Sequence, residues 1–287
     1  MVIEEYKLKN KLFTIAKVVG LMGFYVVTLN FFAFEGDNFL SFLAKKFELN
    51  FLLDNSNSFT FLLSYSFVFI GFLCFLTLVL KFVLKTNLAG IGLFSSPQNI
   101  LFWQGTFQGA FLMFLGSVLM FVLGYLDITE IQFSLFDFLC LGITFLLVAI
   151  HEEILARGIL ISLMNHAFKP YISLLISSLI FGALHLFNAN VTYLSFVNIC
   201  LAGVWLGISY IYKLNLLFPI GLHFGWNFFQ GPVLGFEVSG NTTFTILKQQ
   251  LFGSSLYNGG AFGFEGSVFA IPVLVIGVFW IYQKFAH

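Results

Sequence analysis

The chain has 287 residues, of which 59% are hydrophobic and only 9% are charged, and its 13 basic and 13 acidic residues cancel. Average soluble domains carry about a quarter charged residues, and a water-soluble fold of this length could not cover its surface with so few. The composition therefore predicts an integral membrane protein with the lipid bilayer as its solvent. The zero net charge gives no reason to expect a nucleic-acid partner.

Eight apolar segments are long enough, some of them marginally, to cross the hydrocarbon core as helices of about 20 residues. In chain order they cover residues 12–34, 58–80, 101–126, 138–164, 171–187, 191–212, 214–230 and 267–283. We therefore predict an all-α fold, a polytopic transmembrane bundle of about eight helices. No second soluble domain is apparent, so residues 1–287 are expected to form a single membrane-embedded domain.

Two connecting segments carry patterns of their own. Residues 38–53 have apolar residues at helical spacing and Lys45 and Lys46 on another face, which predicts a helix lying on the membrane surface; an ordinary loop is an equal alternative. Residues 231–266 are rich in Gly, Ser, Asn and Thr. This longest polar stretch is expected to form a loop or cap over one face.

The distribution of lysines predicts the orientation, because cytoplasmic flanks carry the excess of basic residues. With the N-terminus inside, the inner flanks hold Lys7, Lys9, Lys11, Lys81, Lys85, Lys169, Lys213 and Lys284, and the outer segments hold Lys45, Lys46 and Lys248. This bias favours an even number of spans with both termini in the cytoplasm. The compact, Phe-rich chain suits a bacterium, so we expect the bacterial plasma membrane.

Charged side chains inside a transmembrane segment are costly and mark function by default. The fourth segment contains the run HEEILARG, from His151 to Gly158. Glu153 and Arg157 are four residues apart and therefore share a helix face, where they can pair. Glu152 points elsewhere and has no local cation, so it is suited to act as a general base. The alternative is a structural ion-pair network.

Two further motifs place polar residues in later segments. The fifth segment ends in FGALHLFN, with Phe181 and His185 four apart on one face. The short seventh segment contains HFGWNFF, with His223 and Asn227 four apart, so that both can point at one place inside the bundle. Taken singly, each is more simply explained as a hydrogen-bonded core residue or an interhelical polar contact.

Together the motifs predict a hydrolytic site. Glu152 and His185 can bind and deprotonate a water molecule, while His223 and Asn227 can donate hydrogen bonds to the oxyanion that forms at a peptide carbonyl. The same side chains can instead hold a divalent metal, most plausibly zinc, with Glu152, His185 and His223 as ligands. The chain has no HExxH motif, which leaves a zincin-type site unsupported.

The three motifs, in this order, resemble the family of CAAX-processing and bacteriocin-processing membrane proteases, called CPBP or Abi, which includes the Ras-converting CAAX prenyl endopeptidase. That family carries EExxxR, FxxxH and HxxxN in successive membrane helices, and here they stand at 152–157, 181–185 and 223–227. The resemblance covers about a third of the chain, and residues 138–230 are the predicted catalytic core.

The resemblance implies a glutamic or metallo intramembrane endopeptidase. Its roles fall on Glu152 and His185 for water activation and on His223 and Asn227 for oxyanion stabilisation. Glu153, Arg157 and Phe181 are supporting residues, with Arg157 structural or in contact with substrate. The expected partners are the lipid bilayer and a peptide or membrane-protein substrate. Prenylated CAAX tails have no obvious source in a bacterium.

Two other functions stay open from the sequence. Ionisable residues inside the membrane also suit a small transporter, although no inverted repeat is apparent, and a non-catalytic immunity protein would need no active site. One more carboxylate, Glu265, lies at the mouth of the last segment. It lines the entrance to the site or, as the preferred interpretation, is a solvated carboxylate at the interface.

Overall fold

In the computed structural model the chain is mostly helical, and residues 2–54, 57–93 and 99–286 are described. The α-helices are α1 (Val2–Phe47), α2 (Ser58–Leu78), α3 (Asn99–Val122), α4 (Leu135–Glu153), α5 (Ser162–Met164), α6 (Pro170–Leu184), α7 (Tyr193–Lys213), α8 (Leu217–Phe228), α9 (Ser255–Asn258) and α10 (Ala270–Phe285). The π-helical segments Val79–Leu84, Ile154–Ile161 and Phe229–Val233 continue α2, α4 and α8. Two strands, β1 (Leu126–Ile131) and β2 (Leu247–Leu251), pair antiparallel.

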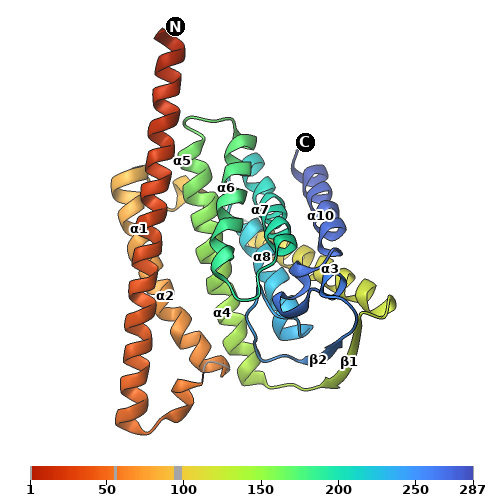
Figure 1. Cartoon of the computed structure of the whole chain (residues 1–287). Helices are drawn as coiled ribbons and strands as arrows, with labels where there is room; N and C mark the ends of the chain where they lie inside the picture. Colours follow the sequence, from red (N-terminus) through yellow and green to blue (C-terminus); the bar gives the residue numbers. More distant parts are fainter. Residues whose placement is uncertain (1, 55–56, 94–98, 287) are drawn as a thin grey trace.

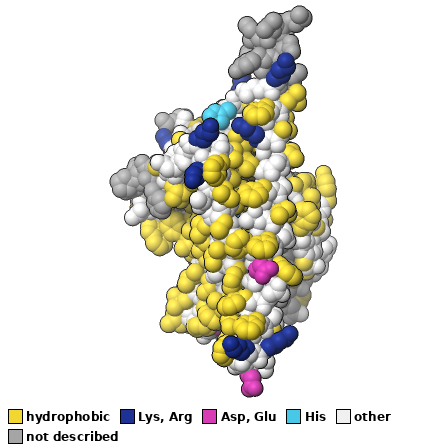
Figure 2. Space-filling view, turned by 90° about the vertical axis from the view of Figure 1, so that its left-hand side faces the viewer, with side chains coloured by type: hydrophobic (Ala, Val, Ile, Leu, Met, Phe, Trp, Pro, Cys, Tyr) yellow, Lys and Arg dark blue, Asp and Glu magenta, His cyan; other side chains and the backbone are white. Residues whose placement is uncertain are grey.

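Several helices are suited to span a bilayer. Within the described ranges, the stretches long and apolar enough are the six Lys9–Phe47, Ser58–Leu84, Asn99–Val122, Leu135–Met164, Pro170–Phe187 and Tyr193–Lys213. Figure 2 shows hydrophobic side chains over the middle of one face, with Lys and Arg gathered toward its two ends. The all-α polytopic bundle is confirmed. Because α8 and α10 are shorter, the count of eight spans stays a prediction.

The first helix is much longer than the sequence indicates. α1 has 46 residues, which corresponds to about 69 Å at 1.5 Å per residue. The separate surface helix predicted at 38–53 is therefore wrong, since residues 38–47 continue α1 and only Asn50–Leu53 form a separate 3-10 turn. Packing against α2 supports the continuation: Gly36 lies against the ring of Phe67, and Gly71 of α2 lies against Phe32.

The third predicted span, 101–126, is too long at its C-terminal end. α3 ends at Val122, and Leu126 already begins strand β1. Gly124 adopts a φ of +77° between them. A left-handed glycine just past the last turn is a common helix stop, and the chain then turns into strand β1.

The closest helix contact in the bundle joins α3 to α8 through glycines on both sides. Gly105 and Gly109 of α3 lie against the backbone of Phe218 and Leu222, and Gly221 and Gly225 of α8 lie against the backbone of Phe102 and Thr106. Each pair is spaced as GxxxG, the pattern that lets membrane helices approach closely. This contact fixes the position of α8.

Gly109→Leu is expected to disrupt this contact, because any Cβ at position 109 would meet the backbone oxygen of Leu222. The variant should lower the free energy of unfolding in micelles by at least about 2 kcal/mol, as overpacking of a tight core does. Titration with denaturing detergent measures it. Gly20→Leu on α1 is the matched control, since no atom lies near its Cβ position. Equal stability of the two variants would contradict the assignment.

The polar segment 231–266 forms the predicted cap at one end of the bundle. It contains β2 and α9, and β2 pairs with β1. Figure 1 shows these elements at the lower end, while the N- and C-termini lie toward the opposite end. An even number of crossings would give that arrangement. The cytoplasmic placement of the termini stays a prediction, and the side chain of Lys7 lies outside the described residues.

Candidate active site

Residues from each of the three motifs line one cavity of about 610 Å³ inside the bundle. Its walls come from α1, α2, α4, α6, α7 and α8 and from the segment between α8 and α10. Glu152, His185, His223 and Asn227 all line it, as does Phe181. Three helices that are separate in sequence therefore bring the four predicted catalytic residues to one space.

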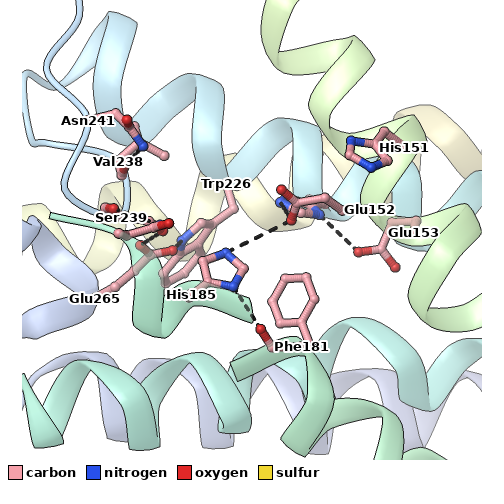
Figure 3. A network of polar contacts seen from close by, with 12 residues as sticks. His151, Glu152, Glu153, Phe181, His185, Trp226, Val238, Ser239, Asn241 and Glu265 are labelled. Carbon is pink, nitrogen blue, oxygen red and sulfur yellow. Dashed lines mark hydrogen bonds and ion pairs between the residues drawn. The ribbon is translucent and has the colours of Figure 1, made fainter. Parts of the chain in front are cut away.

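Glu152 faces His185, as Figure 3 shows, and it also lies near His223. Its Oε2 is 4.0 Å from Nε2 of His185 and 3.9 Å from Nε2 of His223. These distances are too long for direct hydrogen bonds, and within the described part of the chain this Oε2 has no hydrogen-bond partner. The side chain is 24% exposed, so the carboxylate faces the cavity.

Glu153 is turned away from the cavity and is fully buried. Its Oε1 accepts from Nη1 of Arg157 at 2.7 Å, so the predicted ion pair is present. The same oxygen accepts from Nδ1 of His223 at 2.9 Å, a contact that the sequence did not indicate. Nη2 of Arg157 donates to the carbonyl of Gly203 on α7 at 2.7 Å. One carboxylate thus connects α4, α7 and α8.

The backbone fixes the protonation pattern of His185. Its Nδ1 lies 2.8 Å from the carbonyl oxygen of Phe181. A carbonyl only accepts, so Nδ1 carries the hydrogen and the neutral ring presents the lone pair of Nε2 toward Glu152. The ring of Phe181 packs on His185 with centroids 4.7 Å apart and also lies 5.0 Å from the guanidinium of Arg157. The ring of Phe181 therefore contacts both the His185 imidazole and the Arg157 guanidinium.

His223 and Asn227 stand one turn apart on α8, as predicted. Their exposed fractions are 4% and 7%, and both reach the same cavity. Nδ1 of His223 donates to Glu153, which directs Nε2 to the cavity. The spacing of four residues, and the glycine contact that holds α8, explain why the two side chains converge.

The candidate zinc ligands Glu152, His185 and His223 fit a tetrahedral metal poorly. Ligand atoms about 2.0–2.1 Å from zinc lie about 3.3 Å from each other, against 4.0 and 3.9 Å from Glu152 to the two histidines. Among the described residues, no three His, Cys, Asp or Glu side chains are grouped closely enough to hold a metal ion.

A comparison with known families matches this part of the chain. Residues 133–229 match the family described as type II CAAX prenyl endopeptidase Rce1-like, a segment that contains all three motifs. Residues 133–229, about a third of the chain, are therefore similar to the CAAX proteases, and the match supports a peptidase embedded in the membrane. No curated protein and no solved structure matches the chain.

Glu265 lines the same cavity, although it lies outside the matched segment. The preferred interpretation of a solvated carboxylate is wrong, because its exposed fraction is 5% and it lines the cavity. Oε1 accepts from the indole of Trp226 at 3.1 Å, and Oε2 accepts from Ser239 at 2.6 Å. The polar segment folds back over the bundle to place it, which no local sequence pattern indicates.

His151 is the second polar residue whose position the sequence did not indicate. Its Nε2 lies 2.8 Å from the hydroxyl of Tyr25 on α1, and its Nδ1 lies 2.8 Å from the hydroxyl of Tyr65 on α2. Both tyrosines line the cavity. The residue directly before Glu152 therefore ties α4 to α1 and α2, which lie outside the matched segment.

Tyr65→Phe is expected to lower the free energy of unfolding by about 1–3 kcal/mol, because one nitrogen of the buried His151 ring loses its partner. Denaturing-detergent titration of the purified protein measures the change. Tyr193→Phe, at a side chain 85% exposed, is the matched control and should be neutral. A Tyr65→Phe protein as stable as this control would show that the His151 contacts contribute nothing.

Proposed function

We propose that this protein is an intramembrane endopeptidase that hydrolyses a peptide bond of a membrane-associated substrate, with residues 138–230 as its catalytic core. One observation carries the proposal. A cavity-facing carboxylate, Glu152, lies about equally far from two imidazole nitrogens, of His185 and His223, inside a bundle of apolar helices.

The spacing suits activation of a water molecule by Glu152 and His185. Oε2 of Glu152 and Nε2 of His185 are 4.0 Å apart. A water oxygen about 2.8 Å from each of them would form an angle of about 90° with the two atoms. Because Nδ1 of His185 donates to the Phe181 carbonyl, its Nε2 lone pair is free to accept from that water. The general base takes one proton as the oxygen attacks the carbonyl carbon.

His223 and Asn227 form the opposite side of the site and stabilise the oxyanion. The amide of Asn227 donates in every protonation state. His223 donates from Nε2 in its doubly protonated form, in which Nδ1 keeps its bond to Glu153. Preorganised donors of this kind commonly contribute the largest electrostatic part of catalysis.

Removal of divalent metals is expected to leave the rate within about twofold, since the distances from Glu152 to the histidines exceed those of a tetrahedral zinc set. Dialysis against a chelator followed by a peptide-cleavage assay tests this. Elemental analysis of the same sample gives the metal content. A stoichiometric metal whose removal abolishes cleavage would make Glu152, His185 and His223 metal ligands and the enzyme a metalloendopeptidase.

The substrate is proposed to be a membrane peptide or a membrane-protein segment, and the location a bacterial plasma membrane with both termini cytoplasmic. The experiment compares membrane peptides from cells that hold the wild-type protein with those from cells that hold Glu152→Ala. New peptide ends that need Glu152 support proteolysis. Ion flux across liposomes that needs Glu152 without any cleavage would instead favour a transporter, and protection against a bacteriocin that survives Glu152→Ala would favour an immunity protein.

A further inference from the structure

Glu265 is held by hydrogen bonds to its side chain and to its backbone, although the proposed mechanism does not use it. Both of its carboxylate oxygens accept a hydrogen bond, from Trp226 and from Ser239. Its backbone oxygen accepts from Nδ2 of Asn198 on α7 at 2.8 Å. A carboxylate fixed from both ends in a cavity wall is preorganised to meet a ligand.

The Glu265 carboxyl group forms no ion pair with any described residue, and the two histidines that line the cavity, His185 and His223, lie beside Glu152 instead. No Lys or Arg lines the cavity, and no ion pair involves this carboxylate. Its two donors, an indole N–H and a hydroxyl, are both neutral. Together with Glu152 the cavity holds two carboxylates, and a buried charge is costly unless a cation pairs with it. The cavity is therefore suited to a cationic group.

Aromatic rings beside Glu265 suit the same ligand. The indoles of Trp226 and Trp205 both line the cavity, with centroids 5.1 Å apart. Tryptophan has the aromatic ring that attracts ammonium and guanidinium groups most strongly. A carboxylate bonded to one indole, with a second indole packed on the first, is chemistry that recognises a basic side chain with an apolar stem.

We propose that Glu265, Trp226 and Trp205 form a subsite that binds a Lys or Arg side chain of the substrate close to the bond that is cut. The position of this subsite relative to the scissile bond follows from the spacing on α8. Trp226 comes three residues after His223, about one helical turn or 5 Å along the axis. An extended peptide advances about 3.3–3.6 Å per residue, so the basic residue falls one or two positions from the scissile bond. This inference rests on the proposed function.

The same subsite disfavours a free carboxylate near the scissile bond. A C-terminal tail cut a few residues from its end would bring its carboxylate toward Glu265 and Glu152, and like charges at short range repel. We therefore expect cleavage inside a chain next to a basic residue. The subsite residue Glu265 lies outside 133–229, the segment that matches the CAAX endopeptidase family.

The test uses the full-length protein in micelles and apolar peptides that are acetylated and amidated at their ends. A single Lys is moved along the peptide, and each peptide has a twin with norleucine at that position. For the wild type we expect kcat/KM to be about tenfold higher with Lys than with norleucine at one or two adjacent positions. Glu265→Gln should bring this ratio close to one, and Glu265→Asp should keep it well above one.

Glu130→Gln, at an exposed carboxylate on β1, is the matched control and should keep the wild-type ratio. A wild-type ratio near one at every position, or a ratio that Glu265→Gln leaves unchanged, would overturn the proposal. Binding of the same peptides to Glu152→Gln protein gives a readout without hydrolysis. If the wild type cuts none of them, a tenfold tighter Kd for Lys that Glu265→Gln abolishes would support the subsite while the proteolytic function fails.

Discussion

Glu152→Gln should lower kcat for peptide cleavage by about a thousandfold, within the range of 10² to 10⁴ that a positioned general base contributes. The amide has nearly the same shape as the carboxylate but does not take a proton from water. KM should change by less than about threefold, because Glu152 contacts the attacking water and is not proposed to bind the peptide. Single-turnover cleavage of one defined peptide measures both parameters.

Glu35→Gln on the exposed side of α1 is the matched control for the same chemical change, and its kcat should equal the wild-type value. Glu152→Asp tests whether the position of the carboxylate matters in addition to its charge. It keeps the carboxylate but withdraws it by one methylene, so part of the activity should return. A Glu152→Gln enzyme that cuts as fast as wild type would remove Glu152 from the mechanism and leave His185 as the only candidate base.

The candidate site residues could be proposed from the sequence because the directions of their side chains depend on local spacing. Glu152 and Glu153 are adjacent on a helix and point in different directions, so the sequence already separates a paired carboxylate from an unpaired one. His223 and Asn227 lie four apart and share a face. Charges in apolar segments stand out against a background in which only 9% of residues are charged.

The burial of Glu265, the partners of His151 and the length of α1 could not be predicted, because they depend on contacts between distant segments. Glu265 is buried only because the polar segment 231–266 folds back and Ser239 and Trp226 donate to it. His151 is held by tyrosines 126 and 86 residues away in sequence. α1 continues past Gly36 because that glycine meets Phe67 of α2, whereas residues 38–53 alone have the pattern of a separate surface helix.

Arg157→Met is expected to lower the free energy of unfolding by about 3–5 kcal/mol, the usual cost of removing one partner of a buried ion pair. Arg157 is the one arginine in the chain and is 1% exposed. Its loss removes the guanidinium that pairs with the buried Glu153 carboxylate and also the bond to Gly203. Denaturing-detergent titration measures the effect, and Lys169→Met in an exposed turn is the control.

The double variant Glu153→Gln with Arg157→Met shows whether the cost comes from the stranded charge. With both charges gone, the protein should be more stable than Arg157→Met alone, and the amide oxygen introduced by Glu153→Gln can still accept from Nδ1 of His223. Arg157→Lys should lie between wild type and Arg157→Met, because one ammonium cannot reproduce both guanidinium bonds. A double variant less stable than Arg157→Met would mean that Glu153 matters mainly through His223.

The ion pair of Glu153 and Arg157 is also expected to affect the reaction rate, because Arg157 and His223 donate to the same oxygen of Glu153. Residues that share one hydrogen-bond acceptor have coupled effects, commonly by about 0.5–3 kcal/mol. A double-mutant cycle with Arg157→Met and His223→Phe, read in kcat, should therefore be non-additive. Strict additivity would show that the ion pair only stabilises the fold, and that His223 finds its position through α8 and its glycine contact with α3 alone.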